Sequence, residues 1–199
     1  MITLYHAPRS RSSSIVWLLE ELGIPYRIEI TPIIYGDGRG TPAPESYRKI
    51  HPHKKVPAID HDGKIVFESA AITLYLADRF SLGKLAPALD DPRRADYLTW
   101  IAYTVATVGP IIGARFRGWD TESPTGFGTL EEMDACLGHT LEAHPYIVGD
   151  TFTAADTLVG GFVGFFKGTF LPARQAYDDY VERLMARPAR QRAQAKDNG

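Results

Sequence analysis

Apolar and polar residues alternate along the first part of the chain in a pattern that changes from strand to helix and back. Residues 2–5 form a strand candidate. Over residues 12–22, apolar side chains recur on one helical face, and Gly23 and Pro25 follow in the order that ends a helix. Residues 26–30 then alternate between apolar and charged, as in a half-buried strand. This order predicts two parallel strands joined by a right-handed crossover.

A second set of elements follows a loop that is rich in proline and glycine. Residues 56–60 form a strand candidate that opens on a proline, and residues 64–67 form its hairpin partner across an Asp62-Gly63 turn. A helix is expected over residues 70–80. Together these elements predict one compact α/β domain over residues 1–80.

Periodicity is lost over residues 81–91, which are expected to form a linker. Helical patterns without a convincing strand follow, and the first helix is expected to bend near Gly109-Pro110. Capping signals at Thr129 and Thr153 start two more helices. The prediction is therefore an all-helical domain over residues 92–199.

Composition narrows the class of protein. With 44% hydrophobic and 23% charged residues, the 199-residue chain has the balance of a soluble globular protein, and its net charge of −2 does not favour nucleic acid. The single cysteine, Cys136, excludes an internal disulfide framework and a multi-cysteine zinc site, and it points to a reducing cytoplasm. No secretory signal is recognisable at the start. The longest nearly apolar run, Leu158–Phe166, is far shorter than the ~20 residues of a membrane span, so no membrane partner is expected.

Several polar and aromatic residues receive structural interpretations. His51 and His53 lack an evident third ligand, so we expect loop histidines and no metal. Asp156 is expected to cap a helix and join the preceding loop to its first turn. Four basic residues are expected to form a solvated helix end: Arg187, Arg190, Arg192 and Lys196. Four aromatic residues of the helical part could line an apolar pocket but are treated as core residues: Tyr103, Phe116, Trp119 and Phe165.

The segment that best defines a binding site surrounds Pro57, near the start of the strand that is predicted over residues 56–60. An X-Pro bond such as Val56-Pro57 is the place where a cis peptide costs little, ~0.5–1 kcal/mol against ~3–4 kcal/mol elsewhere. Glu68-Ser69 starts the next helix, where alone it would be an ordinary cap. Its place after Val56-Pro57 favours a ligand-facing role instead.

Motifs along nearly the whole chain resemble those of cytosolic glutathione transferases. Residues 51–59 are similar to the family's NPxxKVPxL segment, and residues 68–76 to its ESxAIxxYL helix. Residues 4–12 with 17–26 resemble its first strand and helix, and residues 153–156 the cap of its C-terminal domain. The motifs occur in the family's order and spacing, and the serine-type bacterial and fungal members are the most similar.

The resemblance implies a thioredoxin-like N-terminal domain, an all-α C-terminal domain, a homodimer and an active site between the domains. The implied activity is a cytoplasmic detoxification reaction, in which glutathione is bound as a thiolate and attacks a hydrophobic electrophile. A glutathione-dependent peroxidase, lyase or isomerase reaction stays open. So does a non-catalytic ligand carrier of the same fold.

By matching position, the resemblance also implies the glutathione contacts. Pro57 would be the cis-proline, and the backbone of Val56 would pair with the cysteinyl unit like an added strand. Glu68 would hold the ammonium group of the γ-glutamyl unit, and Ser69, at a helix N-terminus, its carboxylate. Lys55 would bind the glycyl carboxylate.

The group that activates the thiol is expected in the first strand–helix turn. Lowering a thiol pKa of about 8.5 by about two units requires about 2.7 kcal/mol of anion stabilisation, and one hydrogen bond to a charged acceptor contributes ~1.5–3 kcal/mol. Ser10 is the first choice because it precedes the helix and matches the serine of "SR" members. Tyr5, at the strand end, and Ser12 are the alternatives, and Arg11 could add charge. Alone, Ser10 and Ser12 would more often be helix caps, and Tyr5 a core residue.

Overall fold

The structure is a computed structural model that describes residues 1–119 and 126–197. It forms two compact units, Met1–Ser81 with Arg187–Gly199 and Leu82–Ala186. The final helix therefore groups with the N-terminal segment, although the sequence placed residues 92–199 in one domain. The division into independently folding domains stays a prediction.

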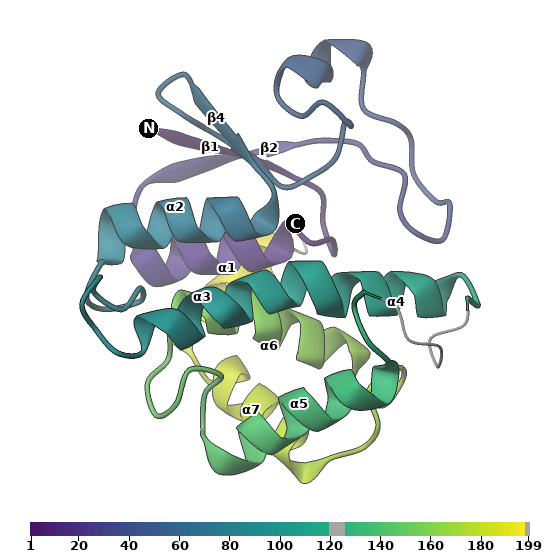
Figure 1. Ribbon diagram of the computed structural model, residues 1–199. Coiled ribbons are helices and arrows are strands. Elements are labelled where there is room, and N and C mark those ends of the chain that lie inside the picture. Colours follow the sequence, from purple (N-terminus) through teal and green to yellow (C-terminus); the bar gives the residue numbers. More distant parts are fainter. Residues whose placement is uncertain (120–125, 198–199) are drawn as a thin grey trace. The chain divides into compact units, whose positions relative to one another are not determined.

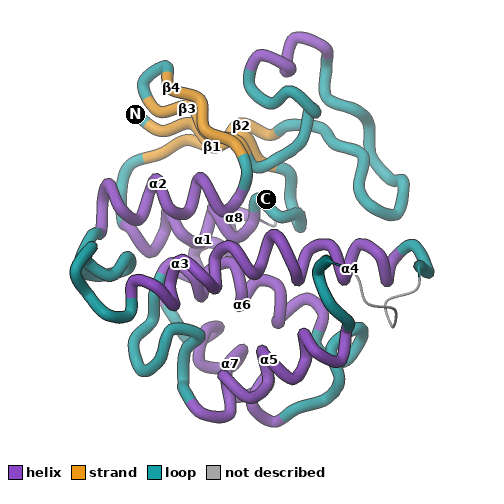
Figure 2. Tube along the Cα trace, viewed as in Figure 1, coloured by secondary structure: helices purple, strands orange, loops and turns teal. Residues whose placement is uncertain are grey.

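The first unit is an α/β structure whose elements are coloured in Figure 2. Its elements are β1 (Ile2–His6), α1 (Ser13–Leu22), β2 (Tyr26–Ile30), a 3₁₀-helix (Glu45–Lys49), β3 (Ala58–His61), β4 (Lys64–Phe67), α2 (Ser69–Ser81) and α8 (Pro188–Asp197). The strands form one mixed sheet in the order β2-β1-β3-β4. β1 and β2 run parallel, as the strand–helix–strand pattern predicted, whereas β3 is antiparallel to both of its neighbours. The expected thioredoxin-like arrangement is confirmed, with α1 and α2 on one face of the sheet (Figure 2).

All 5 residues of the central strand β1 are buried. Since successive side chains of a strand point to opposite sides of the sheet, β1 is covered on both faces. Leu4 is fully buried, as are Ile15 and Leu19 of α1. Burying one such side chain contributes about 1.5–3 kcal/mol. Tyr5, one position along from Leu4, instead packs with Tyr47 in a separate cluster. β1 thus belongs to two apolar layers.

The β3–β4 hairpin turns as the sequence predicted. Asp62 and Gly63 have φ values of 52° and 86°, which are the left-handed conformations that a two-residue type I′ turn requires. β3 begins at Ala58, two residues later than expected, because Pro57 has no N–H to donate to a strand ladder. The Val56-Pro57 peptide bond is cis, as the resemblance implied.

Helix α8 packs against α1, so the expectation of a solvated basic end is wrong. The acidic and aromatic side chains of α1 supply the reason, since each basic residue has a partner there. These pairs are Arg187 with Glu21, Arg190 with the Trp17 ring, and Arg192 and Lys196 with Glu20. Burial alone would raise the pKa of Glu20, but hydrogen bonds from Lys196, Tyr26 and Arg192 outweigh it and lower that pKa to about 2.

The described part of the second unit consists of helices joined by loops (Figure 1). Its helices are α3 (Arg94–Tyr103), a π-helical segment (Thr104–Val108), α4 (Gly109–Phe116), α5 (Leu130–Ala143), α6 (Ala154–Phe166) and α7 (Gln175–Met185). The irregularity expected near Gly109-Pro110 lies one turn earlier. Pro110 cannot donate a hydrogen bond to the preceding turn, and the widened π-helical turn accommodates that missing donor.

The sequence pattern predicted a bent helix over the stretch Arg94–Phe116 but did not mark it as a possible membrane span. It has 23 residues and a mean hydropathy of 1.3, so by length and composition alone it could cross a membrane. Of the most apolar 18-residue segment of this stretch, 44% is buried within the unit. Helix α3 packs against α6. A core helix meets the same criteria, so the absence of a membrane partner stays a prediction.

Asp156 caps α6 as predicted. Its side chain is fully buried, and its carboxylate accepts hydrogen bonds from the N–H groups of Ile147 (2.9 Å) and Thr153 (2.8 Å) and from the Tyr180 hydroxyl (2.8 Å). Burial raises the pKa of this carboxyl, and the hydrogen bonds oppose the shift. Asp156 thus joins the loop before α6, the first turn of α6, and α7.

Candidate active site

The sheet register gathers three of the predicted segments at one end of the first unit. Tyr5 pairs with Ala58, and Ala58 pairs with Phe67, so the end of β1, the start of β3 and the end of β4 are adjacent. The residues that continue from these strand ends are the β1–α1 turn, Val56-Pro57 and Glu68-Ser69. These three segments are far apart in the sequence, but the pairing of β1 with β3 and of β3 with β4 brings them to the same end of the sheet.

Ser12 organises the β1–α1 turn from inside the protein. Its side chain is fully buried, and its Oγ lies 2.7 Å from His6 Nδ1 and 2.7 Å from Ser10 Oγ. It also accepts a hydrogen bond from the Ala7 N–H (3.1 Å), and it can donate one to the Ala7 carbonyl oxygen (3.2 Å). Since a hydroxyl has one proton and two lone pairs, Ser12 can make three of these four hydrogen bonds at a time, and its single proton can go to only one of the possible acceptors.

Ser10 is the hydroxyl of this turn that is partly open to solvent. Its Oγ accepts a hydrogen bond from the Ser12 N–H (3.2 Å), and its carbonyl oxygen accepts one from the Ser13 N–H (3.0 Å) at the start of α1. The side chain therefore has a fixed position at the N-terminus of a helix, where the helix dipole stabilises an anion. Arg11, next to it, is exposed.

Tyr5 lies apart from these serines. Its ring packs edge-on against Tyr47, with 5.5 Å between ring centroids, and only 9% of the residue is exposed. Burial raises the pKa of the Tyr5 phenol, and the charges of Glu29 and Asp60 add to this effect. Its surroundings are those of a core residue.

Glu68 and Ser69 form the start of α2. Glu68 is exposed and has a φ of 71°, a left-handed conformation that costs a non-glycine residue about 1–2 kcal/mol. Its carbonyl oxygen accepts a hydrogen bond from the Ile72 N–H (2.9 Å), so Glu68 occupies the cap position. Ser69 is buried at the first turn. Backbone strain of this kind is enriched at active sites and ligand-binding positions.

The remaining predicted contact residues lie in the loop before β3. Pro57 is buried, Val56 is half-buried and Lys55 is exposed. The Lys55 carbonyl oxygen accepts a hydrogen bond from the Tyr47 hydroxyl (3.1 Å), which holds this loop against the 3₁₀-helix. Val56 precedes the paired residues of β3, so its backbone lies outside the strand ladder.

The two loop histidines have structural partners. His51 is 3% exposed, its ring packs on Phe67, and its Nδ1 accepts a hydrogen bond from the His53 N–H (3.2 Å). Burial lowers the pKa of His51 and favours the neutral ring that this acceptor role requires. Within the described part of the chain, no group of three His, Cys, Asp or Glu residues is arranged to hold a metal ion.

Three of the four aromatic residues that were treated as core are exposed in the second unit, so that interpretation is wrong for them: Phe116, Trp119 and Phe165. The rings of Phe116 and Phe165 both pack on Phe166, whereas the Trp119 ring lies against the Arg117 guanidinium. Phe170 joins them beside Phe116. The cluster thus presents an apolar surface.

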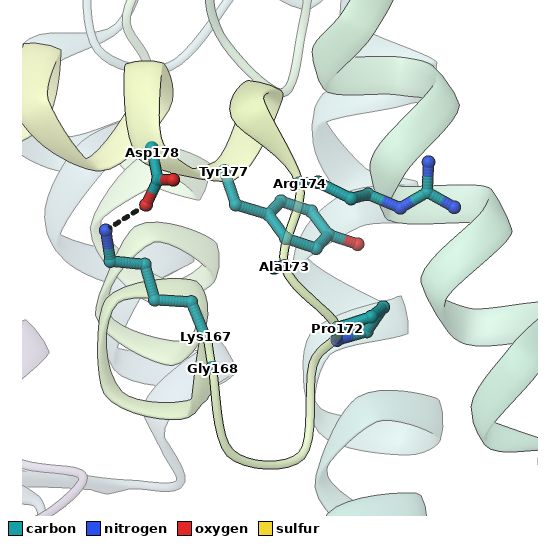
Figure 3. A pocket seen from close by; sticks show the side chains of 7 residues that line it. All are labelled: Lys167, Gly168, Pro172, Ala173, Arg174, Tyr177 and Asp178. Carbon is teal, nitrogen blue, oxygen red and sulfur yellow. Dashed lines mark hydrogen bonds and ion pairs between the residues drawn. The ribbon is translucent and has the colours of Figure 1, made fainter.

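A cavity of about 150 Å³ opens in the same unit between the end of α6 and the start of α7 (Figure 3). Its charged side chains are already paired, Lys167 with Asp178 and Arg174 with Asp134 on α5. The Tyr177 hydroxyl also donates to Asp134 (2.7 Å). These contacts hold α7 in place, and the cavity contains none of the predicted site residues.

Comparison with known proteins decides the family. The family model described as "Glutathione S-transferase, N-terminal domain" matches residues 1–78. "Glutathione S-transferase 3" of Schizosaccharomyces pombe is 32% identical over 177 residues, which cover 78% of this chain and 70% of that protein. The chain belongs to the glutathione S-transferase family.

Two other matches of this glutathione S-transferase family member cover almost its whole length. The "Disulfide-bond oxidoreductase YfcG" of Escherichia coli is 29% identical over 95% of this chain and 92% of that protein. The theta-class glutathione S-transferase of Xanthomonas axonopodis pv. citri, solved with glutathione bound, is 25% identical with a TM-score of 0.74 over 96% of each chain. The predicted thioredoxin-like and helical architecture is thus that of the family.

Two residues near the predicted site were missed by the sequence interpretation. His6 is fully buried beside Ser12, and its Nε2 lies 3.2 Å from Asp197 Oδ1 on α8. The only signal for His6 was a histidine at the end of an otherwise apolar strand. No sequence signal pointed to Asp197, since its role depends on how α8 packs.

Proposed function

We propose that this family member is a glutathione transferase that activates the glutathione thiol through Ser10 for attack on a hydrophobic electrophile. The observation that carries the proposal is the position of Ser10. Its partly open hydroxyl is anchored by buried Ser12 at the start of α1, at the sheet end that also carries Val56-Pro57 and Glu68-Ser69. Neither Ser12 nor Tyr5 combines access with such anchoring.

The contacts expected for glutathione follow from this end of the sheet. The backbone of Val56 lies outside the β3 ladder, which supports pairing with an extended peptide-like ligand. Exposed Glu68 suits an ammonium group, and Ser69 with the free N–H groups of α2 suits a carboxylate. Lys55 is exposed and available for the second carboxylate.

The second substrate is proposed to be apolar. The exposed aromatic rings around Phe166 offer a surface that binds hydrophobic molecules better than charged ones. We also propose a cytoplasmic homodimer, as expected for the family.

The test is an ultraviolet absorbance titration of the thiolate of bound glutathione. We expect the wild-type protein to lower the thiol pKa by about two units, and Ser10→Ala to return it most of the way towards about 8.5. Tyr5→Phe is the matched control, because it also removes one hydroxyl, and it should leave the thiol pKa unchanged. An undepressed pKa in the wild type contradicts the enzyme proposal and favours a ligand carrier. An unchanged pKa in Ser10→Ala contradicts the assignment of Ser10.

A second candidate is glutathione-dependent disulfide reduction, because the relative that matches over 92% of its own length is named a disulfide-bond oxidoreductase. The same activated thiolate would attack a disulfide sulfur, displace the other sulfur as a thiolate and leave a mixed disulfide. A second glutathione thiolate would then attack the glutathione sulfur of this mixed disulfide, displace the substrate's remaining sulfur as a thiolate and form glutathione disulfide. The turnover rates of a small organic disulfide and of an aryl halide, measured with the same protein preparation, distinguish disulfide reduction from glutathione transfer.

A further inference from the structure

The buried histidine at the end of β1 connects the candidate active site to the C-terminal helix. His6 is fully buried, and its Nδ1 lies 2.7 Å from Ser12 Oγ. Its Nε2 forms no well-aligned hydrogen bond among the described residues, and the anion that faces it is Asp197 Oδ1 at 3.2 Å. A buried imidazole between a carboxylate and a hydroxyl has the arrangement that hydrolases use to move a proton.

Asp197 is held in the ionised form by its other contacts. Its Oδ1 accepts hydrogen bonds from Ser13 Oγ (2.7 Å) and from the Arg9 N–H (3.2 Å). Burial alone would raise the pKa of Asp197, but the hydrogen bonds from Ser13 and Arg9 and the proximity of His6 outweigh it and lower the pKa. An ionised carboxylate cannot donate a proton to Nε2, so Nε2 must itself carry one.

The direction of each remaining hydrogen bond follows from this assignment. When His6 is neutral with its proton on Nε2, Nδ1 is an acceptor, and the Ser12 hydroxyl donates to it at 2.7 Å instead of to the Ala7 carbonyl oxygen at 3.2 Å. The 2.7 Å contact between the two serine hydroxyls must then use the proton of Ser10. In this resting state, Ser10 presents lone pairs to an incoming group rather than a proton.

We propose that Ser10, Ser12, His6 and Asp197 form a relay that takes up the proton of the glutathione thiol. The inference rests on the proposed function. The S–H bond breaks and its electron pair stays on sulfur, while the proton forms a new O–H bond on Ser10. The original proton of Ser10 moves to Ser12, and that of Ser12 moves to His6 Nδ1, which gives an imidazolium beside the Asp197 carboxylate. Atoms and charge balance without a further reactant.

The transfer also reverses the hydrogen bonds of the turn. After it, Ser12 donates to Ser10, and Ser10 donates to the thiolate. One event therefore creates the anion and turns the hydroxyl that stabilises it towards the sulfur. Ser10 touches the reacting atom, whereas Ser12, His6 and Asp197 act through it as positioning residues.

Charged and neutral groups of neighbouring elements complete the surroundings of the relay. Arg190 on α8 interacts electrostatically with Asp197, and burial lowers the pKa of its guanidinium. From the other elements, the Thr31 N–H donates to the His6 carbonyl oxygen (2.8 Å) and the Tyr35 hydroxyl to the Pro8 carbonyl oxygen (2.9 Å). These neutral contacts fix the backbone of the turn, so Asp197 is the carboxylate that can stabilise an imidazolium at this position.

The direct test is a ¹⁵N NMR measurement of the His6 ring in the full chain, with and without glutathione. We expect a neutral ring with its proton on Nε2 in the free protein, and a doubly protonated ring when the bound thiol ionises. A ring that stays neutral while the thiolate forms overturns the relay and leaves the proposed transferase function intact. If no thiolate forms in the wild type, the proposed function fails and the relay fails with it.

A variant pair gives an independent readout. Asp197→Asn keeps an oxygen that can accept from Nε2 and Ser13 but removes the charge, so we expect the pKa of the bound thiol to rise by about one unit. Glu21→Gln is the control, because it weakens the contact of α1 with Arg187, the residue before α8, without touching the relay, and the thiol pKa should not change. Equal shifts in both variants would show a merely structural role of α8 and would overturn the relay.

Discussion

The Glu20 carboxylate on α1 accepts a 2.8 Å hydrogen bond from Arg192 Nε on α8, a contact between residues 172 positions apart. Lys196 donates to the same carboxylate, of which only 8% is exposed. This acidic side chain therefore anchors the helix that carries Asp197.

Glu20→Gln is expected to lower the free energy of unfolding at pH 7 by about 1–3 kcal/mol, because two basic side chains lose an ionic partner. The pKa of Glu20 is lowered from 4.5 to about 2, so its contribution is present above pH 4.5 and is lost as the pH falls towards 2. Urea unfolding at several pH values measures this. Glu45→Gln is the control, since Glu45 is a surface residue and its variant should stay close to wild type at pH 7. A pH-independent difference between Glu20→Gln and wild type would contradict the prediction.

Ser12→Ala and Ser10→Ala are expected to separate stability from activation. Loss of the Ser12 hydroxyl leaves the buried Ala7 N–H without its acceptor and His6 Nδ1 without its partner, which should lower stability by about 1–3 kcal/mol. Ser10 is partly exposed, so water can replace its hydroxyl and the stability should change by less than about 0.5 kcal/mol. Thermal unfolding of the two variants checks this. Comparable destabilisation of both would mean that Ser10 also has a structural role.

Asp156→Ala is expected to destabilise the helical unit by about 3–5 kcal/mol. The substitution leaves two buried N–H groups and the Tyr180 hydroxyl without an acceptor. Asp150→Asn is the control, because its side chain is 86% exposed and its loss should cost under about 0.5 kcal/mol. The measurement is urea unfolding followed by circular dichroism. Equal midpoints for both variants would contradict the capping role.

Glu68→Gly is expected to stabilise the protein and weaken its affinity for glutathione. Glycine relieves the backbone strain of a φ of 71°, but it also increases the conformational entropy of the unfolded chain. The net increase in the free energy of unfolding is expected to be about 0.5–1 kcal/mol. Loss of the carboxylate should weaken glutathione binding about tenfold, or about 1.4 kcal/mol. Calorimetric titration and urea unfolding measure the two effects. Asp62→Gly, at a φ of 52° in the hairpin turn, should leave the affinity unchanged, and a similar loss in that variant would refute the assignment.

Local patterns predicted most elements of this protein because each depends on neighbours in sequence. The alternation in residues 26–30, the glycine and proline after α1 and the capping boxes at Thr129 and Thr153 all correspond to observed elements. The start of β3 was placed too early, since Pro57 has no N–H to donate to the strand ladder. The glutathione-contact residues came from the resemblance, and their roles stay proposals.

By itself, the sequence determined the α/β and helical parts, the cis-proline segment and the family, because these follow from short-range periodicity and from motifs in a set order. Only the tertiary structure decided which of the hydroxyls of Ser10, Ser12 and Tyr5 is accessible to solvent, and which buried groups contact it. The burial of Ser12 and Tyr5 depends on the packing of whole elements, and the contact of Asp197 with Ser13 joins residues 184 positions apart. Such long-range contacts depend on how helices dock, which no local pattern of residues encodes.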